Sequence, residues 1–145
     1  FHRNARIYRQ NLPMEQAELE KTIEKAKCNR WRRLSLNSKQ LDTLPNSICD
    51  LPDLAYLNLR DNQLNILPSS NNNLSRLTTL ILDNNSMFAL PEFFVGITGL
   101  KRLSLYNNKI TSLTENINKL SKMQCLNLSS NYLTRLPKSI GSCQI

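Results

Sequence analysis

Residues 54–76 read LAYLNLRDNQLNILPSSNNNLSR, and this stretch decides the fold because the chain repeats its pattern. The shared pattern is LxxLxLxxNxLxxLPxxxxxLxx, and apolar residues fill 34 of the 35 places expected for them, Asn71 being the exception. Five blocks of 23 residues follow one another without insertion: 31–53, 54–76, 77–99, 100–122 and 123–145. A fixed period of this length predicts a solenoid in which each block forms one coil.

The start of each block alternates apolar and polar residues, which predicts one short strand per coil. Stacked coils would place these strands in one parallel sheet along the solenoid. The ninth position of four blocks is an asparagine, which can bond backbone groups that the turn after the strand leaves unpaired. Repeated in every coil, these asparagines predict a structural ladder: Asn62, Asn85, Asn108 and Asn131. We expect the return arc to be 3₁₀, short helix or extended.

These residues make the chain resemble the leucine-rich repeat (LRR) family. The resemblance covers residues 31–145, and the 23-residue length with LPxxIxxL looks like the intracellular class typified by Ras-suppressor-like, Scribble-like and plant Ras-group proteins. It implies an α/β fold, a right-handed leucine-rich-repeat solenoid with the parallel sheet on its concave face. It also implies a non-catalytic module that binds a partner protein through that face.

Residues 1–30 form an N-terminal basic segment with a capping helix predicted over 12–29. Asn11 can cap this helix, and Pro13 suits its first turn. One helix face gathers Leu12, Leu19, Ile23 and Ala26, which with Trp31 would cover the first coil. An amphipathic membrane helix is the alternative, but the apolar face is small and the polar face acidic.

The last block keeps its apolar set and then stops, although a repeat array needs a polar terminal unit. We therefore expect a fragment of a longer protein, with further repeats or an enzymatic domain. End-to-end self-association through the uncapped C-terminal repeat is the competing hypothesis.

Outward side chains of the predicted sheet fall at block positions 2, 3, 5, 7 and 8. Tyr and Arg, the residue types that most often dominate interface energy, gather there in the middle blocks. The predicted partner-binding residues are Arg33, Tyr56, Asn58, Arg60, Ile81, Asp83, Arg102, Ser104 and Tyr106. The alternative is that these residues only decorate a sheet, with Arg60 and Asp83 as a cross-strand ion pair of little energetic value.

The formal charge of +8 makes polyanion or nucleic-acid binding a second alternative. The face offers Arg33, Tyr56, Arg102 and Tyr106 for it, but Asp61 and Asp83 oppose it. Nucleic acid is therefore the less favoured partner.

Catalysis, cofactors and metals find no support in the sequence. The only histidine is His2, and three glycines provide no phosphate-binding loop. We expect no enzyme, no small-molecule cofactor and no metal site; the alternative is the substrate-recognition LRR arm of a larger enzyme or of an injected bacterial effector.

Cellular location is judged from the cysteines and the N-terminus. Four cysteines without a CxxC pair favour free thiols in a reducing compartment, with a Cys28–Cys49 disulfide as the alternative. No apolar stretch opens the chain and none is long enough to span a membrane, although the missing methionine leaves a removed signal peptide open. We expect a cytoplasmic protein, with secretion into a host cell left open.

Overall fold

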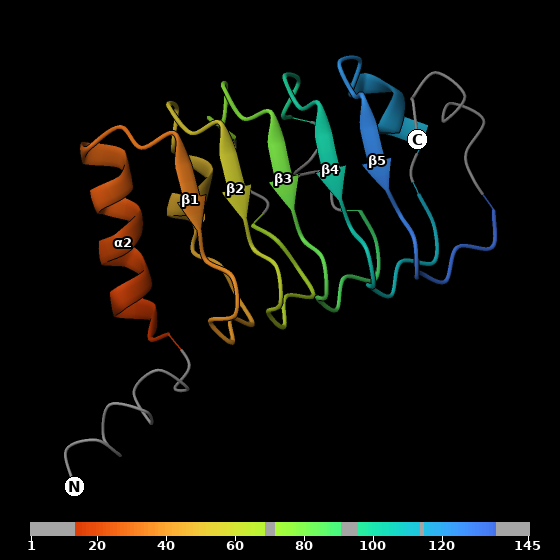
Figure 1. Ribbon diagram of the computed structural model, residues 1–145, viewed down its shortest axis with the longest axis horizontal. Helices are drawn as coiled ribbons and strands as arrows, with labels where there is room; N and C mark the ends of the chain where they lie inside the picture. The colour runs from red at the N-terminus through yellow and green to blue at the C-terminus, as the bar shows by residue number, and fades with distance from the viewer. Residues whose placement is uncertain (1–13, 69–71, 91–95, 114, 136–145) are drawn as a thin grey trace, which may run out of the picture.

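Five short parallel strands form a single sheet along the solenoid (Figure 1). The computed structural model describes residues 14–68, 72–90, 96–113 and 115–135. The strands follow chain order and are β1 (Arg33–Ser35), β2 (Tyr56–Asn58), β3 (Thr79–Ile81), β4 (Arg102–Ser104) and β5 (Cys125–Asn127). The predicted solenoid with one short strand per coil in a single parallel sheet is confirmed.

Each strand is short because only its central side chain points into the core. The five central residues are buried leucines: Leu34, Leu57, Leu80, Leu103 and Leu126. The residues on either side of each leucine point outward and are exposed or half-buried. A period of two is what one buried face and one accessible face require.

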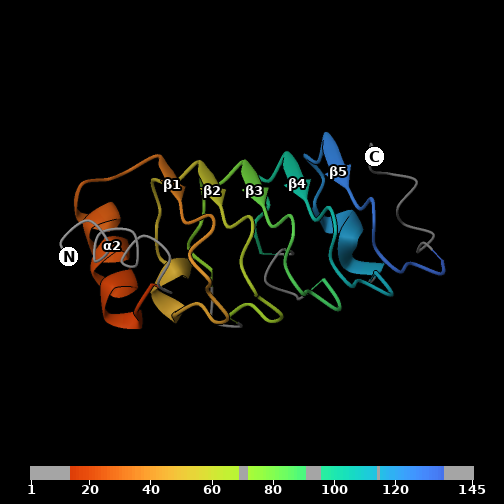
Figure 2. The ribbon, with the colours of Figure 1, turned by 60° about the horizontal axis from the view of Figure 1, so that its bottom comes forward.

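The return arcs lie on the side of the solenoid opposite the sheet (Figure 2). Two of them contain 3₁₀ helices, η1 (Asn46–Cys49) and η3 (Glu115–Lys119). Ile48 and Ile117 project from these helices into the core and are buried. The arc residues Asn71, Phe94 and Ile140 lie outside the described residues.

The asparagines of the ladder form hydrogen bonds that link adjacent coils. Asn62 accepts backbone N–H groups of Lys39 and Leu41 through Oδ1, at 3.1 and 3.0 Å. Its Nδ2 donates to carbonyls of both coils, to Leu36 O at 2.9 Å and Leu59 O at 3.0 Å. The same bridging is repeated in the three later coils by Asn85, Asn108 and Asn131. These amides pair backbone groups that the turn after each strand would otherwise leave unsatisfied.

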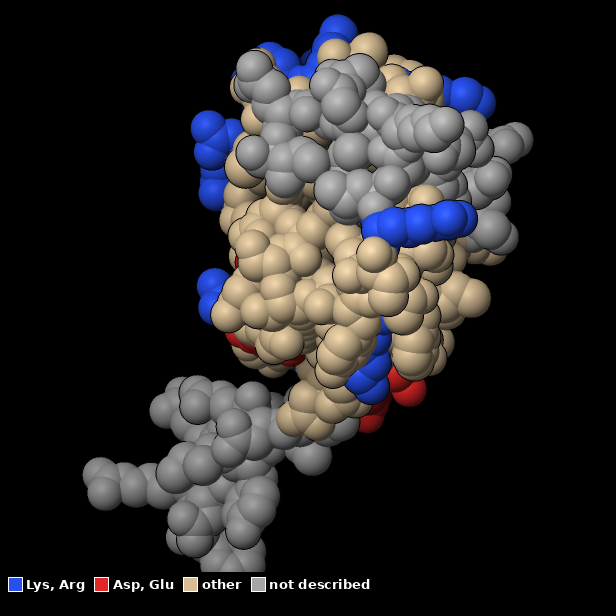
Figure 3. Space-filling view, turned by 90° about the vertical axis from the view of Figure 1, so that its right-hand side faces the viewer, with Lys and Arg blue, Asp and Glu red and all other residues tan. Residues whose placement is uncertain are grey.

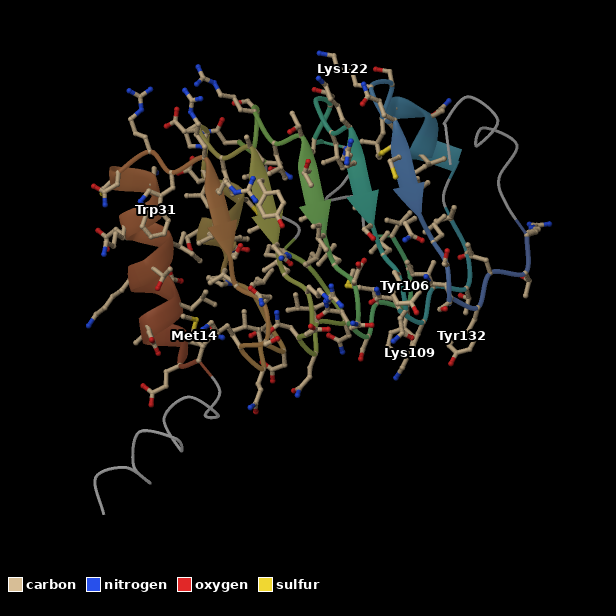
Figure 4. All side chains as sticks on the ribbon, in the orientation of Figure 1. Met14, Trp31, Tyr106, Lys109, Lys122 and Tyr132 are labelled. Atoms are coloured by element: carbon tan, nitrogen blue, oxygen red, sulfur yellow. The ribbon has the colours of Figure 1, made fainter. Side chains whose placement is uncertain are left out.

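Helix α2 (Gln16–Cys28) covers the first coil. Its buried residues are Leu19, Ile23 and Ala26, as predicted. Met14 and Trp31 pack against the same core at the two ends of the helix (Figure 4). The prediction of a helix starting at residue 12 was wrong.

The helix begins at Gln16, and Glu15 occupies the N-cap position with an extended φ and ψ and no side-chain capping bond. The residue before Glu15 is held by a backbone hydrogen bond to the first coil, in which Met14 N donates to Lys39 O at 3.0 Å. Asn11, Leu12 and Pro13, to which the predicted start of the helix was assigned, lie outside the described residues.

Ion pairs fasten the end of α2 to the first coil. Lys27 contacts Asp50, and Arg30 contacts both carboxylate oxygens of Asp53 at 3.2 and 3.3 Å. The hydrogen bond from Lys27 and a second one from Asn73 lower the pKa of Asp50 below its ordinary value. The bond from Arg30 lowers the pKa of Asp53 in the same way. Both carboxylates are therefore favoured in their charged form by folding.

The fifth coil is described only through residue 135. Leu126 is buried in it, whereas Leu128 and Leu133 are partly buried against the core. Leu136, Ile140 and Cys143 lie outside the described residues. The absence of a C-terminal cap and end-to-end self-association therefore stay predictions.

Candidate functional site

The outward side chains of the sheet form straight rows, because each strand pairs with the next at an offset of 23 residues. One row runs through the first residue of every strand: Arg33, Tyr56, Thr79, Arg102 and Cys125. A second row runs through the third residue: Ser35, Asn58, Ile81, Ser104 and Asn127. We call the surface made by the outward residues at block positions 2, 3, 5, 7 and 8 the sheet face.

A hollow of about 420 Å³ opens on the sheet face between β2 and β5. Its outward lining comes from the two rows and consists of Tyr56, Thr79, Ile81, Arg102, Ser104, Cys125 and Asn127. The backbone and inward leucines at Leu80 and Leu103 complete it. The hollow thus combines an aromatic ring, an aliphatic side chain, a guanidinium and short polar groups.

Four of the nine predicted partner-binding residues line this hollow: Tyr56, Ile81, Arg102 and Ser104. Arg33 lies beside it, and its guanidinium carbon sits 4.0 Å from the centre of the Tyr56 ring. This cation–π contact fixes the side chain while leaving the edge of the guanidinium open to an anion.

The other predicted residues of the face are engaged with neighbouring groups. Asp83 accepts hydrogen bonds from Ser104 Oγ at 2.5 Å and from Tyr106 N at 3.1 Å. Arg60 pairs with the adjacent Asp61, with 3.3 Å between Nε and Oδ2. The expected Arg60–Asp83 ion pair is wrong, because Arg60 pairs with Asp61 instead. Asn58 Oδ1 accepts the backbone N–H of Arg60 at 3.0 Å.

The side chains at block position 8 of the sheet face are linked to one another, and these hydrogen bonds were not predicted from the sequence. Asn84 donates to Asp61 Oδ1 at 2.6 Å, and Asn107 donates to Asn84 Oδ1 at 2.9 Å. The eighth residue of every block adopts a left-handed backbone, with φ between 55° and 58°: Ser38, Asp61, Asn84, Asn107 and Ser130. Asn and Asp tolerate this conformation best among residues with a side chain, so their recurrence at position 8 was the available signal.

Aromatic side chains gather at the edge where the strands end. Tyr106, Lys109 and Tyr132 lie near one another at this edge beside β4 and β5, and Lys122 lies at the opposite edge (Figure 4). Phe88 is 55% exposed, Tyr132 is 66% exposed, and the Lys109 Nζ lies 5.6 Å from the centre of the Phe88 ring. Sequence reasoning missed Phe88 and Tyr132 because they fall outside the positions that the repeat assigns to core or sheet.

Charge is unevenly distributed over the molecule. Viewed along the solenoid from its C-terminal end, Lys and Arg side chains project from several margins, and the few acids visible lie in the lower half (Figure 3). On the sheet face, the sequence itself places the charges unevenly. Block positions 2 and 3 contribute four cations and no acid: Arg32, Arg33, Lys101 and Arg102. The acids Asp61 and Asp83 belong to positions 7 and 8, beyond the other end of the strands.

The comparisons with known proteins agree with this architecture. The family model for the leucine-rich repeat matches residues 75–133. A leucine-rich repeat protein of Leptospira interrogans superposes with a TM-score of 0.71 and 38% sequence identity over 76% of this chain. This chain is a leucine-rich repeat protein. A chain from the PEPR1-AtPEP1 crystal structure is also similar, with a TM-score of 0.65 and 28% identity over 77% of the LRR chain described here.

The similarity covers only part of each relative. The LRR chain spans 28% of the Leptospira protein's length and 16% of the PEPR1-AtPEP1 chain's length. No curated protein sequence matches significantly. Among the helices that the structure describes, none has the length and apolar character required to cross a bilayer.

Proposed function

We propose that this LRR chain is a non-catalytic module that binds another protein across its sheet face. The observation that carries the proposal is the hollow between β2 and β5, where Tyr56 and Arg102 stand beside the aliphatic Ile81. An aromatic ring and a guanidinium around a partly apolar hollow are the groups that most often anchor protein partners. The leucine-rich repeat family and the PEPR1-AtPEP1 pairing of one similar structure support the same class of function.

A binding role without catalysis is also part of the proposal. Within residues 14–135, as far as they are described, no group of three His, Cys, Asp or Glu side chains is placed to hold a metal ion. Asp83, which accepts a hydrogen bond from the hollow residue Ser104, accepts a second one from Tyr106 N. These observations favour binding over acid–base or metal chemistry on the face.

We place the module in a reducing compartment such as the cytoplasm. Cys28 and Cys125 are free thiols. Free thiols are the usual state in such compartments. The described cysteines form no disulfide with one another, so the Cys28–Cys49 pairing receives no support.

The test is affinity capture from a nuclease-treated lysate of the source organism. The wild-type chain is compared with a Tyr56→Ala/Arg102→Glu variant that alters the hollow. A Lys109→Glu/Tyr132→Ala variant changes net charge and aromatic content equally, but at the strand-end edge. Circular dichroism and urea unfolding verify that both variants fold.

A partner retained by wild type and by the edge variant but lost by the hollow variant supports the proposal. Truncating a central aromatic or Arg anchor commonly costs about 2 kcal/mol or more, roughly a thirtyfold loss of affinity. Capture of the same proteins by all three baits would remove the sheet face from consideration.

A further inference from the structure

Four cations lie at the end of the sheet face where the strands begin: Arg32, Arg33, Lys101 and Arg102. No described carboxylate on the sheet face neutralises their charge. Arg33 stacks on Tyr56, and no ion pair involves Arg102 or Lys101 among the described residues. Arg32 has a more distant electrostatic interaction with Asp53, a carboxylate that already holds Arg30 and Arg76. Positive charge at this end of the sheet therefore remains available to a ligand.

The acids of the sheet face cannot supply the missing counter-charge. Asp61 pairs with Arg60 and accepts a bond from Asn84, and Asp83 is held by Ser104 and Tyr106. Both belong to block positions beyond the strand ends, whereas the cations belong to positions at the strand starts. Block positions 2 and 3, at the strand starts, carry four cations and no acid, so a ligand that crosses there meets a net positive charge.

From this arrangement we propose that the sheet face binds an extended, acidic segment of a partner protein, with two carboxylate side chains four residues apart. The backbone positions of Arg33 and Arg102 lie in the same row, three strand spacings apart, which is about 14 Å at about 4.8 Å per strand. An extended chain advances about 3.3 to 3.4 Å per residue, so four residues cover the same span. The inference rests on the proposed function and specifies its ligand chemistry.

The hollow reaches the middle of the proposed segment. Halfway between Arg33 and Arg102 the row passes between Tyr56 of β2 and Thr79 of β3, which line the hollow and carry no charge. The residue midway between the two acids would lie over these two side chains, where a small or apolar residue buries surface and a charged one loses hydration without a partner. The preferred ligand pattern is thus acid, three residues with an uncharged centre, acid.

Extended geometry fits this face better than a helix. A helix docks through a continuous apolar stripe, to which it contributes about three to four residues in every two turns. The hollow offers Tyr56 and Ile81 as its outward hydrophobic side chains, alternating with polar groups along the two rows. An extended segment can place single side chains between such groups.

The test is panning of a phage-displayed random 12-residue peptide library on the folded chain, followed by synthesis of the enriched peptides. We expect enrichment of Asp or Glu pairs four residues apart, with an uncharged residue midway. Arg33→Ala and Arg102→Ala should each weaken the synthetic peptide about fivefold to tenfold, the range expected of a partly exposed charge-assisted pair. Lys109→Ala removes the same charge at the opposite edge and should leave affinity unchanged.

A double-mutant cycle identifies direct pairing. If a peptide acid contacts Arg102, replacing that acid by Ala should hardly weaken binding to the Arg102→Ala chain any further. The double replacement should then lose about as much binding free energy as Arg102→Ala alone. Independent, additive losses at both acids would overturn the assignment of carboxylates to these arginines. Enrichment without acids, or with acids at no preferred spacing, would overturn it as well.

The outcomes separate this inference from the proposed function. Peptides without paired acids that still lose binding in Tyr56→Ala would leave the sheet face as a protein site and reject the acidic pattern. Peptides insensitive to every sheet-face variant would reject both. Failure to enrich any peptide would reject the proposal that the ligand is a short acidic segment. The capture experiment would still test separately whether the sheet face binds a protein. Tighter binding of a single-stranded oligonucleotide than of the peptides, lost in Arg102→Ala, would assign the cations to nucleic acid instead.

Discussion

Replacing Asn85 by alanine tests whether the ladder holds the coils together. The Asn85 Oδ1 accepts the backbone N–H of Leu64 at 3.0 Å. Its Nδ2 donates to Leu59 O and Leu82 O, both at 3.0 Å. Leu59, Leu64 and Leu82 are buried with exposures of 1% or less, so water cannot replace the lost partner without opening the core.

The expected cost follows from which groups keep another partner. Leu59 O still accepts from Asn62, and Leu82 O still accepts from Asn108, so each carbonyl loses one of two donors. The Leu64 N–H is left without its described acceptor. An unpaired buried N–H costs about 1–3 kcal/mol and each of the two lost carbonyl bonds about 1 kcal/mol, which places Asn85→Ala at about 3–5 kcal/mol of destabilisation.

The assay is urea unfolding followed by far-ultraviolet circular dichroism. With an m-value of about 1–3 kcal/mol/M, a 3 kcal/mol loss lowers the midpoint by about 1 M or more. The matched control is Asn65→Ala, because Asn65 is an exposed asparagine of the adjacent coil and its loss should cost less than about 0.5 kcal/mol. Equal midpoints for the two variants would refute the assignment of structural energy to the ladder.

Three further predictions concern other parts of the chain. Folding lowers the pKa values of Asp50 and Asp53, so their stabilising contribution is complete above the unfolded pKa and is lost as pH falls below about 4. The urea midpoint should therefore decrease as the pH is lowered from about 5 to about 2.5. The decrease should be smaller in an Asp50→Asn/Asp53→Asn variant. Ser38 has a φ of 56°, so Ser38→Gly should raise the free energy of unfolding by about 0.5 kcal/mol and Ser38→Val should lower it by about 1 kcal/mol, measured by the same urea titration; a stabilising valine would contradict the backbone argument. Cys125 is exposed and Cys49 is 1% exposed, so a thiol reagent should label the former first and the latter only on unfolding, as peptide mass mapping would show; simultaneous labelling of the folded chain would be the contrary result.

The repeat made most of the fold predictable. Each block must bury the same apolar positions, so the period alone places one strand per coil and aligns Arg33, Tyr56, Thr79 and Arg102 in one row. The side chains of α2 that meet the first coil were also predictable, since Leu19, Ile23 and Ala26 share one helical face. Periodic burial is a strong constraint because violating it in one coil exposes the core of two.

Features set by local competition were not predictable. The start of α2 is one such feature, because Glu15 occupies the N-cap position without a side-chain capping bond and is not a residue type that signals a helix start. The partner of Arg60 depended on side-chain choices between Asp61 and Asp83, whose energies differ by little at an exposed surface. No periodic constraint applies to such groups, so the sequence pattern does not rank their alternatives.

The register of the sheet also sets how the reach of this surface could change during evolution or design. Every strand pairs with its neighbour at an offset of 23 residues. Duplicating one whole block between β2 and β3 would therefore leave each turn and each inward leucine between the same kinds of coil as now. The same duplication would move Arg33 one strand spacing, about 4.8 Å, farther from Arg102. Ligand length would then be altered by gene duplication, while the chemistry at either end of the row stayed the same.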